Sequence, residues 1–429
     1  MIVFLDSLVG PSHHFGGIAS GNLASKSNQY QSSNPRQAAI EGLEKMKVID
    51  SLGFTQFLLP PQIRPQASFL KAIGLKGGFS EPQLNALFHR SPSQFSSLFS
   101  TAYMWMANAG IVSSAADTTD GNVHITPANL QTCFHRSLES KETSEHFKAL
   151  FSKSTNVIVH APVHSSFSDE GSANVIRLFG DVDGPGVNLF VYGNSASENS
   201  KTKFPARQSR EALEVIERTH QLKHVVYARQ HSRAIDAGVF HNDVIAMGVG
   251  RTIIVHENAY YNLDKVLDEL NKKATAAFNK TLKIVVVTEN ELPLEDAIAT
   301  YFFNSQLLQK KNGQIVMVAP EQCKKHKAAK KLMARLVKQK IISKIVTVPL
   351  GESMNNGGGP ACLRLSMDLP QSVIKKIPKE YKFTIKRYDV LKEFIQTNYP
   401  DWIVLRHFND AEFVHELLGI QASLCSVFK

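Results

Sequence analysis

A cysteine, a histidine and an acid in three separate segments could together form a nucleophilic site. The cysteine is Cys362, which ends the run NNGGGPAC (355 to 362). Consecutive glycines allow unusual backbone angles and close approach by other groups, and the following proline fixes the exit angle. We therefore expect this turn to hold one side chain in one place. The alternative is a small buried apolar residue at the start of a strand, the commonest role of a cysteine.

The histidine lies in the run GVFHNDVIAM, which places His241 and Asp243 two residues apart at the start of a predicted strand. Alternate side chains of a strand point to one face, so the imidazole and the carboxylate can face one cavity. A thiol with a pKa of about 8.5 is only slightly ionised at neutral pH, so a nucleophilic cysteine needs a nearby cation. His241 is the best candidate for this partner. The alternative is a surface turn in which Asp243 caps backbone N–H groups.

The acid lies in the run SDEGSANVIRL, where Glu170 follows Asp169 and precedes Gly171. Two acids beside a glycine are typical of a solvated turn. The functional interpretation is a carboxylate that orients an imidazole or holds a cation.

Other motifs argue against a bound nucleotide or metal. The glycine-rich segments FGGIASGN (15 to 22) and NNGGGPAC lack both the GK[ST] ending of a phosphate loop and the GxGxxG order of a dinucleotide site. The four cysteines form no CxxC pair, so neither a zinc ribbon nor a disulfide framework is indicated. We expect no cofactor and no metal.

The basic run CKKHKAAKKLMARLVKQK (323 to 340) does not by itself indicate a nucleic-acid site. Ala329, Leu332, Leu336 and Val337 form an apolar stripe at helical spacing, so the lysines fit the solvated face of an amphipathic helix. The net charge of +10 favours acidic partners or anionic substrates without choosing between them.

Composition is that of a folded globular protein, with 43% hydrophobic and 20% charged residues among 429. The N-terminus has no early Lys or Arg, and Asp6 interrupts its apolar run, so we expect no secretory signal. No apolar run approaches membrane-spanning length. We expect a cytoplasmic protein with no membrane partner.

Predicted strands and helices alternate, which indicates an α/β protein. A helix should start at Asn34-Pro35 and end at Gly53. Strands are predicted at 156–163, 187–193, 224–230 and 283–289, with a hairpin over 243–257 that turns through Gly248 and Gly250. From residue 293 we predict a helix to about 311, a strand at 313–320, a helix at 321–341, and strands at 344–350 and 361–369. Paired strands followed by a helix recur loosely, and we expect residues 1–429 to form one catalytic domain.

Nine ordered segments resemble the N-succinylarginine dihydrolases. They extend from about residue 6 to about residue 366 and read DSLVGPSHHFGGIASGN, SNPRQAAIEGLEKMK, MWMANAG, FHRSLE, DEGSAN, FPARQSRE, GVFHNDVIA, YFFNSQLL and SMNNGGGPACLRL. After DEGSAN this chain has Val175 where the family usually has histidine, and the stretch after Leu418 matches poorly. The resemblance implies the pentein fold, a five-bladed α/β propeller whose repeats surround a central active site.

The same resemblance implies a triad of Cys362, His241 and Glu170. The implied substrate contacts are Gly16, Gly17, Ile18, Ala19, Ser20, Gly21, Asn22, Leu23, Ala24, Ser25, Asn108, His135, Arg136, Arg207, Asp243 and Asn356. The substrate, N2-succinyl-L-arginine, has a guanidinium at one end and two carboxylates at the other. Acids such as Asp243 and Glu170 suit the cation, and the basic residues Arg207, Arg136 and His135 suit the anions.

The implied reaction consumes two waters and yields N2-succinyl-L-ornithine, two ammonia and CO₂ through a covalent Cys362 intermediate, in arginine catabolism. The resemblance also implies a homodimer.

Two other functions stay open at this point. A deiminase acting on arginine or a related guanidine would stop after one hydrolysis. A non-catalytic, basic nucleic-acid-binding protein would show binding that depends steeply on salt.

Overall fold

Small three-stranded sheets carry the β-structure of the chain. The computed structural model describes residues 1–76, 78–197 and 201–428, and within them the strands form five sheets. In order across each sheet, the strands are β15 (Arg364–Asp368), β1 (Ile2–Ser7) and β2 (Gln56–Leu59); β3 (Gly110–Ser113), β4 (Val123–Pro127) and β5 (Val157–Val159); β6 (Val175–Phe179), β7 (Gly186–Tyr192) and β8 (Val225–Arg229); β9 (Ala246–Val249), β10 (Thr252–His256) and β11 (Lys283–Val287); β12 (Gln306–Gln309), β13 (Ile315–Pro320) and β14 (Lys344–Val348).

Each sheet repeats one pattern. Its central strand is antiparallel to one neighbour and parallel to the other. A parallel neighbour requires a crossover connection, which at least one helix provides in every sheet. In the first sheet the antiparallel neighbour of β1 is β15, so the first and the last strand of the described residues meet in one sheet. The α/β prediction is confirmed, and the loose recurrence of paired strands followed by a helix corresponds to these repeats.

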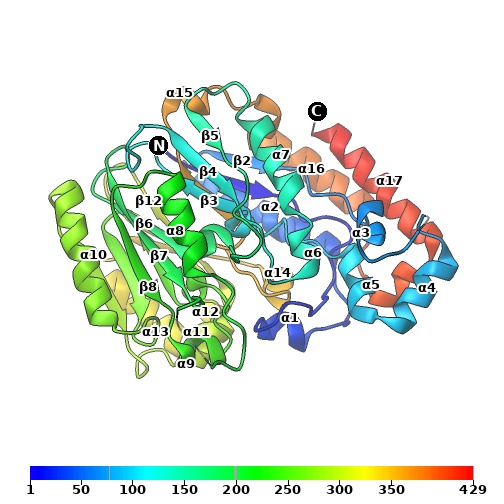
Figure 1. Cartoon of the computed structure of the whole chain (residues 1–429), viewed down its shortest axis with the longest axis horizontal. Helices are drawn as coiled ribbons and strands as arrows, with labels where there is room; N and C mark the ends of the chain where they lie inside the picture. Colours follow the sequence, from blue (N-terminus) through cyan, green and yellow to red (C-terminus); the bar gives the residue numbers. More distant parts are fainter. Residues whose placement is uncertain (77, 198–200, 429) are drawn as a thin grey trace.

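The helices connect the strands and cover the sheets (Figure 1). They are α1 (Leu23–Ser27), α2 (Pro35–Ser51), α3 (Ala67–Ala72), α4 (Glu81–Arg90), α5 (Pro92–Phe99), α6 (Phe134–Ser137), α7 (Ser140–Leu150), α8 (Arg210–Thr219), α9 (Ser232–Asp236), α10 (Leu263–Phe278), α11 (Leu294–Thr300), α12 (Glu321–Lys325), α13 (Lys327–Lys338), α14 (Gly351–Asn355), α15 (Gln371–Ile374), α16 (Ile385–Asn398) and α17 (Ala411–Val427).

The predicted helix from Asn34-Pro35 is confirmed as α2. The side chain of Asn34 accepts a hydrogen bond from the backbone N–H of Gln37, as an N-cap should, and Pro35 occupies the first turn. Gly53 follows the helix in the left-handed region, with φ of +89°. Local capping signals therefore determined this helix.

A group of helices lies at one side of the molecule, where α3, α4, α5 and α17 are drawn together (Figure 1). Buried Phe69, Leu84, Phe95 and Phe99 from the first three helices pack in one cluster with Leu417 of α17. Leu424 and Phe428, in the stretch after Leu418 for which a poor match was expected, are buried in a neighbouring cluster, so this stretch is also part of a packed core.

Two predicted helices differ in the structure. The helix predicted from 293 to 311 ends at Thr300, where Tyr301 takes the left-handed conformation, and residues 306–309 instead form β12. Pairing of β12 with β13 overrode the local helical pattern. The helix predicted at 321–341 is split into α12 and α13 because His326 has an extended backbone.

Two details of the predicted faces and turns are wrong. Ala329, Leu332 and Leu336 are buried on the inner face of α13, but Val337 is 41% exposed. Gly248 lies within β9, and the hairpin turns at Gly250, where φ is +59°.

Among the described residues, no helix combines the length and apolarity needed to span a bilayer.

Candidate active site

The glycine turn delivers Cys362 to a buried position between α14 and β15. A side chain on Gly358 would overlap the ring of Trp105, and a Cβ on Gly359 would lie 2.7 Å from Asn304 Oδ1. The turn can therefore pass between these two residues only without side chains, which explains the run of glycines. Cys362 is 2% exposed, and its backbone carbonyl accepts a hydrogen bond from the N–H of Ala107.

Asn304 holds the nucleophile turn from two sides. Its Nδ2 lies 3.1 Å from Cys362 Sγ, and its Oδ1 accepts a hydrogen bond of 3.2 Å from the Cys362 backbone N–H. Sequence reasoning did not assign Asn304 to the site, although it lies in the YFFNSQLL segment that carries the resemblance. An amide that can donate to the sulfur stabilises a thiolate there.

His241 and Glu170 form a hydrogen-bonded pair, with 2.8 Å between Nε2 and Oε2. Both are buried, at 2% and 0% exposure. Because Nε2 faces the carboxylate, it carries the proton, and Nδ1 is left as the basic atom. Nδ1 has no hydrogen-bond partner among the described residues. Glu170 thus orients the imidazole, the functional interpretation considered for it above.

The segment around His241 differs from the predicted strand start. His241 precedes a 3₁₀ turn, Asn242–Val244, and β9 begins only at Ala246. The two side chains nevertheless flank the thiol. His241 lines the same cavity as Cys362, and Asp243 Oδ2 lies 3.4 Å from Cys362 Sγ. A turn, rather than strand alternation, brings them together.

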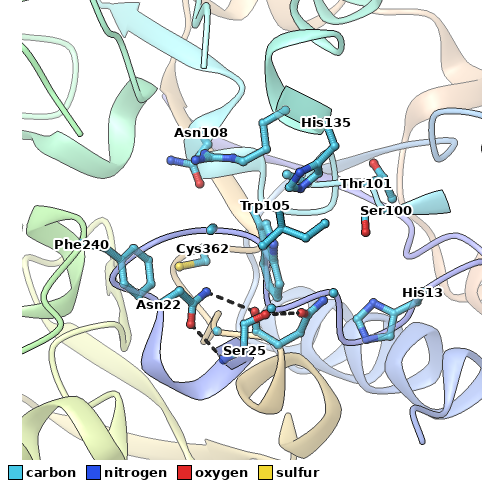
Figure 2. A pocket seen from close by; sticks show the side chains of 18 of the residues that line it. His13, Asn22, Ser25, Ser100, Thr101, Trp105, Asn108, His135, Phe240 and Cys362 are labelled. Carbon is cyan, nitrogen blue, oxygen red and sulfur yellow. Dashed lines mark hydrogen bonds between the residues drawn. The ribbon is translucent and has the colours of Figure 1, made fainter. Parts of the chain in front are cut away.

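Cys362 and His241 line one cavity, which holds about 650 Å³ of empty space when the part open to solvent is included (Figure 2). Most of the predicted site residues line it. They are Gly16, Gly17, Ile18, Ala19, Asn22, Ser25, Asn108, His135, Arg136, Arg207, His241, Asn356 and Cys362. Figure 2 shows Cys362 and Phe240 toward one side of this view and His13 toward the other.

Six predicted residues do not line this cavity. Glu170 lies behind His241, and Asp243 borders a second cavity on the other side of the thiol. Ser20 and Gly21 belong to the same loop, and the Ser20 carbonyl accepts a hydrogen bond of 2.6 Å from Arg207. Leu23 is 43% exposed in α1, and the carbonyl of Ala24 is occupied within that helix.

The loop of residues 16–25 is fastened to the nucleophile turn. Asn22 caps α1 by accepting from the Ser25 N–H, and its amide donates to the carbonyl of Asn356. The Ser25 hydroxyl donates to Asn356 Oδ1 at 3.1 Å (Figure 2). Gly357, next in the turn, has φ of +98°, and a side chain there would overlap Asn22. The loop and the turn therefore form one wall of the cavity.

The two arginines have different partners. Arg136, expected to suit the anionic end of a substrate, forms an ion pair of 2.7 Å with Glu170. Arg207 lies over the ring of Phe240, 4.7 Å from its centroid, and is buried at 6% exposure. No Asp or Glu among the described residues lies within ion-pair distance of Arg207. Arg207 is therefore the cation best placed to receive an anionic ligand group.

The histidine is neutral in the free site near neutral pH. Burial lowers the pKa of His241 to about 4, although Glu170 acts in the opposite direction. Burial alone would raise the pKa of Glu170, but Arg136, His241 and Arg207 together hold it below its usual range. Glu170 therefore stays a carboxylate beside a neutral imidazole.

The thiol is also neutral, which corrects the expectation that His241 supplies the activating cation. Burial and the neighbouring Asp243 raise the pKa of Cys362 well above its usual range. Burial raises the pKa of Asp243 to about 6, so at neutral pH this carboxylate is mostly charged. An anion at the sulfur opposes thiolate formation. The free site therefore needs a cation from the ligand before the nucleophile can ionise.

Several cavity residues were missed by sequence reasoning. His13, His14, Ser100, Thr101, Ala102, Trp105, Phe240 and Gly357 line the cavity beside the predicted set. Five of them, His13, His14, Trp105, Phe240 and Gly357, lie in segments that the resemblance quoted, so their position near the site could have been suspected.

The remaining cysteines lie apart from the nucleophile turn. Cys133 Sγ is 3.2 Å from His135 Nδ1, and Cys323 is the buried residue of α12, with its thiol toward the carbonyl of Thr300. Cys425 lies on α17. All four thiols are free. Within residues 1–76, 78–197 and 201–428, no group of three His, Cys, Asp or Glu side chains is arranged to hold a metal ion.

Comparison with known proteins gives the same family over the whole chain. A family model described as succinylarginine dihydrolase matches residues 1–429. The N-succinylarginine dihydrolase of Aliivibrio fischeri strain MJ11 is 41% identical over 419 residues, spanning 96% of this chain and 93% of the relative. The N-succinylarginine dihydrolase of Pseudomonas fluorescens strain SBW25 is 40% identical over 435 residues, spanning 100% of this chain and 97% of the relative.

Solved structures share the fold at much lower identity. The complex of AgrE with ornithine and NAD+ has a TM-score of 0.53 at 14% identity, covering 86% of this chain and 40% of that one. The N-terminal domain of ArgZ, described as an arginine dihydrolase from the ornithine-ammonia cycle in cyanobacteria, has a TM-score of 0.51 at 14% identity, covering 86% of this chain and 99% of that one. These similarities support a pentein-like α/β fold.

Proposed function

Because this chain belongs to the succinylarginine dihydrolase family, we propose that it hydrolyses N2-succinyl-L-arginine to N2-succinyl-L-ornithine, two ammonia and CO₂. One observation carries the proposal for the site. A buried thiol and a carboxylate-oriented imidazole line one cavity together with Arg207, and an acid contacts the thiol from its other side. A cation-binding end and an anion-binding wall match a substrate with opposite charges at its two ends.

The substrate guanidinium would bind against Asp243, beside Cys362. Its positive charge offsets the anion that raises the pKa of the thiol, so ligand binding itself favours ionisation. The thiol proton then passes to Nδ1 of His241, and Glu170 stabilises the imidazolium. Asn304 donates to the resulting sulfur anion. The free enzyme keeps an unreactive thiol, and the bound enzyme generates the nucleophile.

The thiolate attacks the guanidinium carbon, and His241 gives its proton to the departing ammonia. This leaves a thiouronium on Cys362. Water attacks the same carbon, loses a proton to His241 and expels the thiolate, giving N-succinylcitrulline. A second attack on the ureido carbon releases the second ammonia and leaves a thiocarbamate on the sulfur. Water converts this intermediate to a carbamate, which breaks down to N-succinylornithine and CO₂.

Arg207 would receive a carboxylate of the succinyl group. It is buried, lines the cavity and has no acidic partner among the described residues, so an anionic ligand group would satisfy it. His135 and Arg136 border the same region and would complete the anionic end. The remaining cavity residues of the 16–25 loop, with Asn108 and Asn356, would contact the polar middle of the substrate.

The five sheets fit a closed five-bladed propeller around this site. Strands of all five sheets line the second cavity, behind Cys362, as inner strands around an axis would. We take residues 1–429 as one catalytic domain because β15 completes the sheet that β1 begins.

We also propose a homodimer in the cytoplasm that uses neither nucleic acid nor a membrane as its partner. Light scattering of the purified protein would test the dimer.

Product analysis with N2-succinyl-L-arginine and free arginine side by side tests the function. We expect two ammonia for each succinylarginine consumed, with little turnover of free arginine. One ammonia per substrate would indicate a deiminase instead, and preference for free arginine would remove the role given to Arg207.

A matched pair of variants tests the anionic end. Arg207→Met should raise KM for succinylarginine by about tenfold or more, because a charge-assisted hydrogen bond is lost. Arg218→Met, which removes an exposed arginine of α8, is the control and should leave KM unchanged. An unchanged KM in Arg207→Met would contradict the assignment.

A further inference from the structure

A second cavity lies behind the nucleophile, with about 1120 Å³ of empty space when the part open to solvent is included, and Asp243 is the one lining residue given a part in substrate binding above. Its inner end is formed by Ala361, which precedes Cys362, and by Asp243, whose Oδ2 is 3.4 Å from the sulfur. The first and second cavities share no lining residue. The thiol and the Asp243 carboxylate thus stand between them.

Polar groups at the inner end of this rear cavity lack protein partners. Oδ1 of Asp243 and Nε of Arg364 are buried and have no hydrogen-bond partner among the described residues. Both side chains line the rear cavity. A buried donor and a buried acceptor without protein partners are satisfied by small polar molecules, and a polar cavity of this size holds water.

The rear cavity adjoins an open groove at the surface. Ile2, Phe54 and Gln309 line both this cavity and an open groove that includes Met1, Asp183 and Lys311. The groove shares no lining residue with the substrate cavity. The outer end of this path is therefore separate from the walls that would hold the succinyl group.

The chemistry of the proposed reaction requires such a path. This inference rests on the proposed function, in which two waters are consumed and two ammonia released while the succinyl end fills the front cavity. The nitrogen that leaves is held by Asp243, so ammonia forms beside the inner wall of the rear cavity. We propose that the rear cavity, from Asp243 to Gln309, is the passage through which water reaches the reacting carbon and ammonia departs.

The passage can be plugged without touching the site. Ser366, on β15, lines the rear cavity, is exposed, and forms no side-chain hydrogen bond among the described residues. Ser366→Trp should narrow the path and lower kcat for succinylarginine by about fivefold or more with KM unchanged, because release would limit turnover. Ser366→Ala should behave as the unmodified enzyme. Ile284→Trp adds the same ring at an exposed strand position that borders none of these cavities.

Ammonium inhibition of the unmodified enzyme gives a second measurement that does not depend on the folding of Ser366→Trp. If ammonia uses the rear path, it enters while substrate occupies the front cavity, so inhibition should be noncompetitive with succinylarginine. Competitive inhibition, or full kcat in a folded Ser366→Trp, would show that ammonia does not leave through the rear cavity. Failure of the proposed function would appear differently, as absence of succinylarginine turnover in the unmodified enzyme, and would remove the passage as well.

Discussion

Replacing Asp243 by asparagine should change thiol reactivity and turnover in opposite directions. The carboxylate raises the pKa of Cys362 in the free site, so its removal should make the free thiol react faster with iodoacetamide at pH 7. The same carboxylate would hold the substrate guanidinium, so its removal should lower kcat/KM. A general loosening of the site would also expose the buried thiol, so the comparison requires that Asp243→Asn keeps the melting temperature of the unmodified enzyme and the alkylation rates of its other three cysteines.

The distance between the Asp243 carboxylate and the Cys362 sulfur determines how strongly the carboxylate should affect thiol ionisation. Two unit charges 3.4 Å apart interact by about 5 kcal/mol at an effective dielectric constant of about 20. Asp243 has a pKa of about 6 and also interacts with groups other than the thiol. We therefore expect only a fraction of this energy to act on Cys362. Even a quarter of it changes the thiolate population about tenfold. We therefore expect about tenfold faster alkylation of Cys362 in Asp243→Asn.

Mass spectrometry of the alkylated peptides separates Cys362 from the other three cysteines. Asp169→Asn is the matched control, because Asp169 is buried and lies beside Glu170 but does not touch the sulfur. Its alkylation rate should stay near that of the unmodified enzyme. Equal or slower alkylation in Asp243→Asn would refute the view that this carboxylate suppresses the free thiol.

Three further predictions follow from the same contacts. Glu170→Gln should lower kcat about a hundredfold or more while the fold is retained, because the amide cannot stabilise the imidazolium of His241. An unchanged kcat would show that Glu170 does not support His241 in the reaction. His14 is neutral when buried, with a pKa lowered by burial to about 4, and it protonates below about 6.5 when unfolded, so it reduces stability as pH falls between these values. Denaturant unfolding at pH 6.5 and 4.5 should show a smaller loss for His14→Gln than for the unmodified protein. Gly358→Ala should lower the melting temperature by several degrees because its Cβ overlaps an indole ring, whereas Gly42→Ala, in open space on α2, should not lower it.

Part of the site was readable from the sequence because it depends on residue types and local geometry. Three glycines and a proline predicted a turn that presents Cys362, and overlap of any side chain with Trp105 or Asn304 explains why glycine is needed. The caps of α2 and the apolar stripe of α13 were readable for the same reason, since each involves neighbours within a few residues.

Other features depended on contacts between distant segments. Residues 306–309 became a strand because β13 supplied a partner, and a single sequence pattern does not contain that partner. Nothing in the sequence indicated that Arg136 would also pair with Glu170, and the fold brings the two side chains to 2.7 Å. Asn304 was overlooked because an asparagine after two phenylalanines gives no local sign that it will meet a sulfur 58 residues away.

The sequence by itself determined which chemical groups are present and which family the chain resembles. Tertiary structure decided their protonation. Cys362 and His241 were expected to activate each other, yet burial makes both neutral and Asp243 opposes ionisation of the thiol. The physical reason is that the energy of a charge depends on the solvent and charges within a few ångströms, and only the folded chain sets those.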